Sequence, residues 1–499
     1  MADIPFRLRD PMPASHSASG RCVISGLLIR MSKIQPTWAP ERRRGKLPLL
    51  GGLRDFVDRL ANSSPARLAL IVYAGVIFVF AGLLALPASA ADGRMTALSD
   101  AFFTAVSAVC VTGLTVVSTA EHWSPFGQVV ILLGIFIGGL GTLTLASLLT
   151  LAVSKRLGVR GKLIAQEALN AGRLGEVGTL LRIVITTSVV IEVALALTLI
   201  PRFIILGEPL GQAVWHGVFY SISAFNNAGF TPHSDGLVPY ETDGWILFPL
   251  MIGVFLGSLG FPVVMILLER GWRYRNWNLH TKLTIEVSLI LLLAGALAWG
   301  AMEWNNPRTI GGLDTWDKTL HAFFASVMTR SGGFNLVDMN RMDSSSMLLT
   351  DALMFAGGGS ASTAGGIKVT TIAIVFLAIM AEARGDNDVK VHGRTIPASA
   401  MRVAISVIVA GATWVAVGAG MLLAMTGASL DRVLFEVISA FATVGLSTNI
   451  SAEAPAEGKY VLAVLMFAGR VGTITLASAL ALRERRQLYH FPEERPIIG

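Results

Sequence analysis

Apolar residues gather in eight long segments, separated by more polar connections. Each segment has about 20 or more mainly apolar residues, the length that a helix needs to cross a bilayer. Half contain no Asp, Glu, Lys or Arg, and the others hold one charge each, at Glu192, Glu286, Lys368 and Arg470. The pattern predicts an all-α polytopic membrane protein with eight transmembrane helices. The segments are 68–87, 125–154, 183–201, 244–268, 283–302, 352–381, 403–430 and 460–482.

Lys and Arg mark one side of the predicted membrane domain. They are frequent in the connections 153–182, 269–282 and 382–402 and in the C-terminal residues 483–499, and rare in the opposite connections. Cytoplasmic loops carry the excess of Lys and Arg in membrane proteins. An even number of spans also places both ends on one side. We therefore expect both termini in the cytoplasm.

Each opposite connection contains a second apolar stretch that is too short to span a bilayer. It is long enough for a half-membrane helix followed by extended backbone, which is tolerated at that depth only when buried in protein or lining water. A re-entrant pore loop meets that condition. The four stretches are 100–113, 214–229, 319–333 and 433–445.

The four short stretches share one register. Each has a Phe ten residues before a Gly, with Leu or Phe directly after the Gly, and three of them have a Ser six residues before it. Self-similarity at a regular spacing indicates repeats of one structural unit. We interpret the unit as span, pore helix, glycine loop, span, arranged four times around a central pore. The alternative is chance similarity among apolar helices.

This repeat divides the chain into an arm, four units and a tail. The boundaries are 1–66 for a basic cytoplasmic N-terminal arm, 67–160, 161–275, 276–390 and 391–488 for the four repeats, and 489–499 for the C-terminal tail.

Composition excludes several classes of protein. Of 499 residues, 53% are hydrophobic and 15% charged, against about 25% charged in soluble domains. An ordinary cytosolic enzyme and a disordered chain are therefore excluded. The two cysteines form no disulfide framework. The net charge of +7 lies in residues 1–67, which hold 12 Lys/Arg and 5 Asp/Glu. This arm is interpreted as a topology-setting tail, with contact to anionic membrane lipid or a partner as the alternative.

The glycine loops suggest a site for a monovalent cation. Loops meeting at one axis can present rings of backbone carbonyls that replace the hydration shell of K⁺. Glycine gives the backbone freedom that a Cβ would deny. Side chains in the loops carry no fixed charge, apart from Arg330 just upstream of the third loop, and a divalent ion would favour carboxylates. The candidate K⁺ filter residues are Val111, Thr112, Gly113, Asn227, Ala228, Gly229, Ser331, Gly332, Gly333, Thr443, Val444 and Gly445.

Six motifs in order carry a family resemblance. The sequence resembles the Trk/Ktr/HKT superfamily of potassium transporters, and most of all the Ktr-type membrane subunit, over about residues 65–499. The resemblance implies K⁺ uptake across a bacterial inner membrane, with Gly113, Gly229, Gly333 and Gly445 as filter glycines. In the plant branch, Ser at the first of these positions goes with Na⁺ preference, so Gly113 implies K⁺. The motifs are Ser107–Leu114, Ser223–Phe230, Thr329–Asn335, Ser362–Lys368, Gly469–Gly472 and Pro492–Gly499.

A glycine- and hydroxyl-rich break interrupts the segment 352–381. Such a break at mid-membrane depth suits a movable gate below the filter, and the resemblance implies the same; a static kink is the alternative. Arg470, if it faces the pore, would form an electrostatic barrier, while a snorkelling or structurally paired Arg is the alternative. The candidate gate residues are Gly357, Gly358, Gly359, Ser362, Thr363, Gly365, Gly366, Lys368 and Arg470.

Other ionisable residues give weaker signals. Glu192 and Glu286 are candidate proton or sodium sites, but pairing with a neighbouring helix is the preferred interpretation. His122, His216 and His321 lie near the ends of pore segments without metal-ligand spacing, so we interpret them as interfacial.

The resemblance also implies partners. It predicts a homodimer in which Tyr489–Gly499 helps form the contact, and a separate cytosolic ring of nucleotide-binding regulatory subunits. No covalent cofactor and no nucleic acid is expected. K⁺ is the expected transported ion and Na⁺ a candidate activator, with Na⁺ or H⁺ coupling left open.

Two other classes of protein compete with this interpretation: an alternating-access transporter for an organic solute and a membrane enzyme. The repeats run parallel, which disfavours an alternating-access transporter. The charges within the spans are isolated, so they do not form a catalytic site, and an enzyme is not expected.

Overall fold

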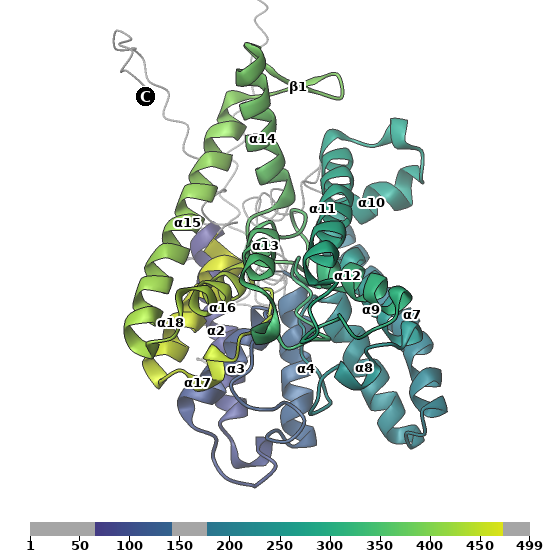
Figure 1. Cartoon of the computed structure of the whole chain (residues 1–499), viewed down its shortest axis with the longest axis vertical. Helices are drawn as coiled ribbons and strands as arrows, with labels where there is room; N and C mark the ends of the chain where they lie inside the picture. The colour runs from purple at the N-terminus through teal and green to yellow at the C-terminus, as the bar shows by residue number, and fades with distance from the viewer. Residues whose placement is uncertain (1–64, 142–176, 473–499) are drawn as a thin grey trace, which may run out of the picture. The chain divides into compact units, whose positions relative to one another are not determined.

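The computed structural model describes residues 65–141 and 177–472, all of which lie in the compact unit Gly51–Gly499. Figure 1 shows that this part of the chain is mostly helical. Several sequence-based predictions fall outside the described residues: the arm 1–66 apart from its last two residues, the stretch 142–176 at the boundary of the first two repeats, and residues 473–499 with the C-terminal tail.

The elements follow in chain order. The α-helices are α2 (Pro65–Leu84), α3 (Leu98–Val109), α4 (Pro125–Gly139), α7 (Val177–Ile205), α8 (Leu210–Phe225), α9 (Gly244–Leu259), α10 (Phe261–Arg270), α11 (Leu279–Glu303), α12 (Thr315–Met328), α13 (Ser344–Phe355), α14 (Val369–Arg384), α15 (Ala398–Thr426), α16 (Leu430–Ala442), α17 (Ile450–Glu453) and α18 (Ala456–Phe467). Short 3-10 turns cover Pro87–Ser89, Val238–Tyr240, Tyr274–Asn276 and Met339–Arg341, and a π-helical turn covers Ala468–Gly472.

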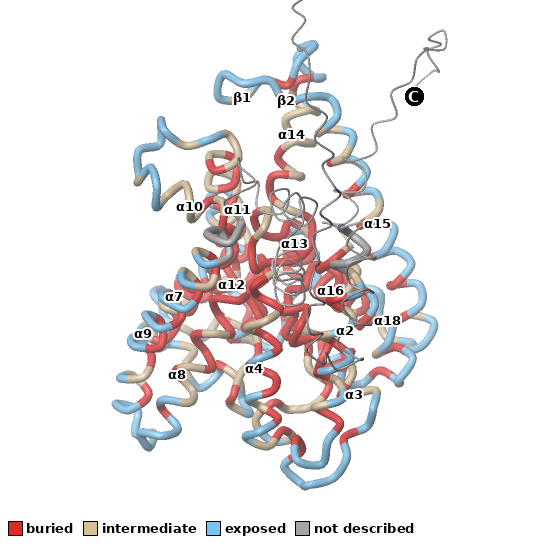
Figure 2. The backbone as a smooth tube through the Cα atoms, turned by 180° about the vertical axis from the view of Figure 1, so that it is seen from behind, coloured by how far each residue is buried: buried red, intermediate tan, exposed pale blue. Residues whose placement is uncertain are grey.

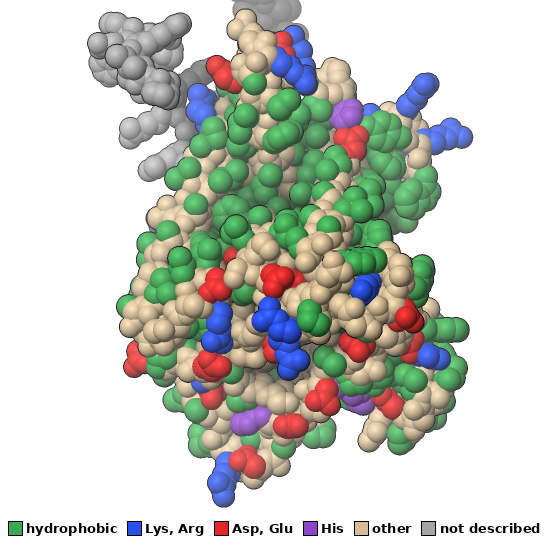
Figure 3. Space-filling model, in the orientation of Figure 1, with side chains coloured by type: hydrophobic (Ala, Val, Ile, Leu, Met, Phe, Trp, Pro, Cys, Tyr) green, Lys and Arg blue, Asp and Glu red, His purple; other side chains and the backbone are tan. Residues whose placement is uncertain are grey.

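Three helices in the described residues are long and apolar enough to cross a membrane without a break. They are Arg182–Ile205 within α7, α11 and α15. Each covers a segment predicted to span, and each exposes large apolar side chains such as Val190, Leu297 and Val409. The segments beginning at residues 68 and 125 start as the shorter helices α2 and α4. Figure 3 shows hydrophobic side chains over the face formed by α14 and α15, with most charged groups in a band below.

The segment 244–268, predicted to span the membrane, contains a sharp bend. Helices α9 and α10 meet there at a bend of 95°. Gly260 lies between them with φ of 93°, a conformation that costs glycine little, and Pro262 opens the first turn of α10. A Cβ on Gly260 would lie 2.5 Å from the carbonyl oxygen of Ser360. The bend therefore lets the break between α13 and α14 approach closely.

A small β-hairpin departs from the expected all-α fold. Strands β1 (Val389–Val391) and β2 (Arg394–Ile396) pair antiparallel at the far end of α14 and α15 (Figure 1). The two turn residues, His392 and Gly393, have φ of 49° and 72°. Positive φ at both positions is typical of the tight turns that match strand twist. These two residues therefore allow the chain to reverse direction in a hairpin with a two-residue turn.

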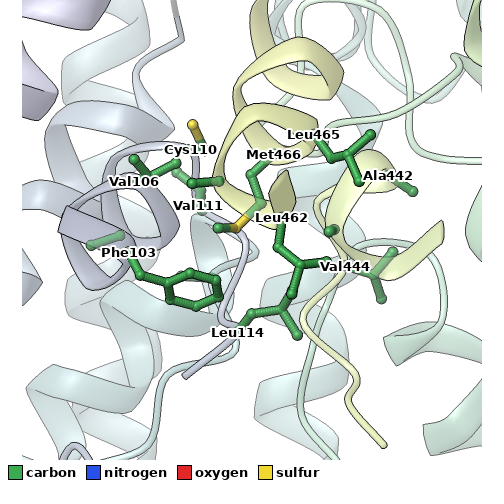
Figure 4. Close-up of a cluster of buried hydrophobic side chains, with 14 of the residues drawn as sticks. Phe103, Val106, Cys110, Val111, Leu114, Ala442, Val444, Leu462, Leu465 and Met466 are labelled. Atoms are coloured by element: carbon green, nitrogen blue, oxygen red, sulfur yellow. The ribbon is translucent and has the colours of Figure 1, made fainter. Parts of the chain in front are cut away.

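The main apolar core includes buried side chains of α3 and α16, and a second core includes those of α8 and α12. Figure 2 shows buried residues concentrated in the middle of the described part and exposed residues toward the outer ends of the helices. In Figure 4, Val111 and Leu114 after α3 lie near Leu462 and Met466 of α18, with Val444 alongside. All five of these side chains are buried. The short apolar stretches are therefore the packing centre of the described residues.

Candidate ion-binding site

Four short helices end in the same backbone conformation. Each of α3, α8, α12 and α16 covers one of the predicted half-membrane stretches. After each helix comes a non-glycine residue with positive φ, and two residues later a glycine with positive φ. The pairs are Val111 (56°) and Gly113 (91°), Asn227 (61°) and Gly229 (71°), Ser331 (83°) and Gly333 (74°), and Thr443 (49°) and Gly445 (98°). Left-handed backbone at a non-glycine residue is uncommon and costs free energy.

The four glycine loops contact one another in chain order, and the fourth contacts the first. In each contact the glycine approaches the next loop so closely that a Cβ would clash with its backbone. A Cβ on Gly113 would lie 2.1 Å from Ala228 O, and one on Gly333 would lie 2.5 Å from Val444 O. A Cβ on Gly445 would lie 2.2 Å from Thr112 O. A Cβ on Gly229 would lie 2.8 Å from Gly333 Cα and 3.2 Å from Gly332 O. The carbonyls before the four glycines thus lie within one closed ring.

Serine side chains hold three of these loops. Gly113 N donates to Ser107 Oγ at 3.1 Å, and Gly445 N donates to Ser439 Oγ at 3.1 Å. Ser223 Oγ instead donates to the Phe230 carbonyl at 2.8 Å. The Ser shared by three repeats therefore has a structural role, because its side chain holds the turn that follows the helix.

The third loop lacks that serine and is held differently. Its position is taken by Val327. The amides of Gly332 and Gly333 donate to the Met328 carbonyl at 2.8 and 3.3 Å. Ser331 Oγ donates to the Thr443 carbonyl of the fourth loop at 2.9 Å. The third loop is thus tied both to the end of its own helix and, through Ser331, to its neighbour in the ring.

A buried glutamate that the sequence reasoning did not select holds the segment after the fourth loop. The Glu436 carboxyl accepts bonds from the backbone amides of Thr448 and Ser451 at 2.9 and 3.1 Å, and from Ser447 Oγ at 2.8 Å. The available signal was an acidic residue in the middle of an apolar stretch. Such a group is tolerated in the core only when it is hydrogen-bonded.

The break predicted within 352–381 is present, and it contacts the ring. Helix α13 ends at Phe355, and α14 begins at Val369. The Gly365 amide donates to Ser331 Oγ at 3.3 Å, and a Cβ on Gly365 would lie 1.8 Å from Thr443 Oγ1. Thr363 Oγ1 donates to the Phe225 carbonyl at 3.2 Å. This segment, called the gate loop below (residues 356–368), therefore contacts residues of the second, third and fourth glycine loops or their helices.

The gate loop also docks on the bend between α9 and α10. Gly359 N donates to the Ser258 carbonyl at 2.7 Å, and Phe261 N donates to the Ala361 carbonyl at 3.2 Å. Ser362 Oγ closes a turn inside the loop by donating to the Gly359 carbonyl at 2.7 Å. The loop is thus held by hydrogen bonds and also by apolar packing, since Ile367 is buried in the main apolar core.

Two cations lie at the gate loop. Lys368 Nζ donates to the carbonyls of Ala364 and Gly365 at 2.7 and 3.4 Å. Arg470 is buried; it donates through Nη1 to the Thr363 carbonyl and through Nη2 to the Gly138 carbonyl of α4 at 2.8 Å. Arg470 therefore joins the gate loop to a helix of the first repeat. It lies in a π-helical turn, which is often found at functional sites.

Both glutamates that were candidate proton or sodium sites are paired. Glu192 is buried and accepts from Asn226 Nδ2 at 2.7 Å at the end of α8, so pairing with a neighbouring helix is confirmed. Glu286 contacts His392 Nε2 at 2.9 Å and accepts from the Tyr274 hydroxyl. Its partners lie in the hairpin turn and a 3-10 turn rather than in a neighbouring α-helix.

The three histidines selected from the sequence have different surroundings. His122 Nε2 lies 3.1 Å from Thr96 Oγ1, and His321 Nε2 lies 2.9 Å from the Glu241 carbonyl. His216 lies beside Glu208 and His233. His216 therefore has two neighbours of types that can ligate a metal. Spacing along the chain gave no signal, because the three residues come from different segments.

Apolar helices of spanning length around glycine loops in mutual contact define a membrane transport protein. Residues 69–487 match the family model TrkH, described as "Cation transport protein". The chain belongs to this family.

Known relatives cover almost the whole chain. It is 36% identical to "Ktr system potassium uptake protein B" of Vibrio alginolyticus over 92% of this chain and 99% of the relative. It is 34% identical to the protein of the same name in Bacillus subtilis, over 89% and 99%. It is also 34% identical to "Potassium/sodium uptake protein NtpJ" of Enterococcus hirae, over 85% and 95%. In fold it is similar to the potassium transporter TrkH from Vibrio parahaemolyticus, with a TM-score of 0.61 at 19% identity, covering 82% of this chain and 85% of that one.

Proposed function

We propose that this protein takes up potassium ions across the plasma membrane through a channel-like pore. The observation that carries the proposal is the closed ring of four glycine loops, in which the carbonyls of Thr112, Ala228, Gly332 and Val444 approach the neighbouring loops. Carbonyl rings can replace the hydration shell of K⁺. Relatives named as potassium uptake proteins support the choice of ion.

The proposed architecture has eight spans in four repeats around this ring, with both termini in the cytoplasm. Four repeated pairs of left-handed residues support the fourfold arrangement. The bent pair α9 and α10 and the pair α13 and α14 would each count as one interrupted span. Irregular backbone at membrane depth is tolerated there because it is buried in protein.

The gate loop is proposed to close the pore on the cytoplasmic side of the ring. Arg470 would hold the closed position, because it joins the Thr363 carbonyl in the loop to the Gly138 carbonyl in α4. A fixed positive charge below the ring would also repel cations. Opening then requires this arginine to release at least one of the two carbonyls.

Partners follow from the family rather than from the described contacts. We propose a homodimer whose opening is controlled by a separate cytosolic nucleotide-binding subunit. The word "system" in the names of two relatives supports an assembly of more than one component. One relative is named for both potassium and sodium, so Na⁺ is included below as a candidate activator or second ion.

Rescue of a bacterium deficient in K⁺ uptake tests the proposed function. We expect the chain, expressed together with the regulatory subunit of its own source, to restore growth at low external K⁺. Growth should be compared with and without Na⁺, to separate activation from simple uptake. Gly75→Ser is a matched control, since a Cβ there meets nothing within 4 Å. Failure to rescue by a chain that reaches the membrane would contradict the proposal.

A further inference from the structure

Two histidines and a glutamate converge beside the second glycine loop. Glu208 lies between α7 and α8, His216 lies in α8, and His233 follows the loop by four residues from Gly229. Glu208 Oε2 is 2.7 Å from His216 Nδ1, and Glu208 Oε1 is 3.3 Å from His233 Nε2. One ligand atom from each lies within 4.8 Å of the others. These three residues are called the His–Glu cluster below.

A second layer of side chains orients the cluster. The Tyr220 hydroxyl lies 2.9 Å from His233 Nδ1 and donates to the Gly236 carbonyl at 3.3 Å. It can therefore accept from Nδ1–H, which leaves the lone pair on Nε2 facing Glu208. The Tyr240 hydroxyl donates to Glu208 Oε1 at 3.3 Å. Metal-binding histidines typically donate their other ring N–H to such a partner, which fixes the tautomer.

The cluster is partly buried and still reachable from solvent. Neutral imidazole and carboxylate are the protonation states that ligate. The side chains of Glu208, His216 and His233 are 16%, 16% and 19% exposed, so they are shielded yet open to solvent.

The donor set selects the class of ion. Imidazole nitrogens favour Zn²⁺, Cu²⁺ and similar transition metals, whereas Ca²⁺ and Mg²⁺ prefer oxygen alone. Donors about 2.0–2.1 Å from a tetrahedral Zn²⁺ lie about 3.3 Å from one another. The observed separations of 2.7 and 3.3 Å need only small side-chain movements to match. Three protein donors would leave a fourth position for water.

We propose that Glu208, His216 and His233 bind a divalent transition metal of the Zn²⁺ class, and that the bound metal lowers potassium uptake. The metal would tie the segment after the second glycine loop to helix α8 and to the end of α7. That segment is continuous with Gly229, whose neighbour in the ring is Gly333. The effect on uptake, and access from the outer side, rest on the proposed function; binding of the metal does not.

Binding is tested on the purified full-length chain in lipid nanodiscs. Zn²⁺ alone is titrated calorimetrically after chelator treatment. We expect His216→Gln and His233→Gln each to weaken the affinity by about tenfold or more, the scale of losing a metal-site contact. His122→Gln, whose ring contacts Thr96, should bind as the native chain does. Glu208→Gln serves as a further variant if a histidine variant fails to elute as a single species.

The outcomes separate the parts of the inference. Equal isotherms for the native chain and all cluster variants would overturn the site, leaving a hydrogen-bonded cluster without metal. In proteoliposomes, external Zn²⁺ should reduce uptake by the native chain but not by His216→Gln. Binding without any reduction of uptake would overturn the coupling. A chain that binds Zn²⁺ at the cluster but carries no K⁺ would contradict the proposed function and leave the metal site standing.

Discussion

The ring of glycine loops and the gate loop are both rich in glycine, but they are held in different ways. In the ring, backbone meets backbone: a Cβ on Gly113 or Gly445 would lie 2.1 or 2.2 Å from a carbonyl oxygen of the next loop. The gate loop is closely packed too, since a Cβ on Gly359 would lie 2.4 Å from the Leu259 carbonyl oxygen, but it is also held by two cationic side chains, Lys368 and Arg470, which donate to its carbonyls.

The difference suggests which part is fixed and which part moves. The ring consists of four similar loops, each in close contact with the next, so a shift of one loop would displace its neighbours. The gate loop occurs once in the described residues, and its proposed opening would break individual hydrogen bonds, each contributing about 0.5–3 kcal/mol. We therefore expect ring substitutions to alter ion preference and gate substitutions to alter the rate and control of flux.

Gly113→Ser is expected to have the largest effect. A side chain at positive φ costs about 1–3 kcal/mol, and the clash with the Ala228 carbonyl adds to this strain. The preference for K⁺ over Na⁺ should fall by about tenfold or more, since 1.4 kcal/mol corresponds to tenfold. Competitive uptake in proteoliposomes measures this preference, with Gly75→Ser as control. Unchanged preference would count against the ring as the selective element.

Arg470→Ala should act on the gate alone. Hydrogen bonds from a charged group contribute about 1.5–3 kcal/mol. Because the proposed opening requires release of at least one of them, the variant should favour opening and raise flux by about tenfold or more. Ion preference should stay native. Flux without the regulatory subunit is the measurement, and Arg402→Ala on the exposed face of α15 is the control. A variant with native flux and native control would remove the barrier role of Arg470.

Glu436→Gln should weaken the ring without touching the gate. A carboxyl group has two oxygens that accept hydrogen bonds, whereas an amide has one. The variant therefore loses part of the hydrogen bonding to the segment after Gly445, which should lower the free energy of unfolding by about 1–3 kcal/mol. The thermal unfolding midpoint of the purified protein should fall. Glu453→Gln, at an exposed position, should leave it unchanged. A midpoint equal to the native one would show that the Glu436 contacts contribute little.

Ser331→Ala is expected to have the smallest effect, and it should change both ion preference and flux. Ser331 Oγ donates to the Thr443 carbonyl in the ring and accepts from the Gly365 amide in the gate loop. Neutral hydrogen bonds contribute about 0.5–1.5 kcal/mol. Ion preference and flux should each change by about two- to fivefold. Ser406→Ala, which alters a bond within α15, is the control. A change confined to one property would mean that ring and gate are not joined here.

The sequence predicted those parts of the fold that depend on a repeated local pattern. The Phe and Gly register placed four short helices within a few residues of α3, α8, α12 and α16. The glycine-rich run from Gly357 placed the break between α13 and α14. In both cases the backbone itself requires the residue type, because a Cβ would clash.

Features that depend on distant partners could not be predicted. Gly260 and Pro262 lie within a predicted span, but nothing local to them indicates that the Ser360 carbonyl approaches Gly260. Glu208, His216 and His233 share no spacing, and the fold alone brings them together. Arg470 was visible as a charge within a span, but its two carbonyl partners lie in other repeats.

Location of a K⁺ substitute by anomalous diffraction tests the central claim most directly. Crystals of the native chain grown with Tl⁺, an electron-rich monovalent cation of similar size, are compared with crystals grown in Na⁺. We expect a Tl⁺ peak within the ring, bounded by the carbonyl oxygens of Thr112, Ala228, Gly332 and Val444. A ring without Tl⁺, with the ion bound by side chains elsewhere, would contradict the claim that these loops dehydrate the transported ion.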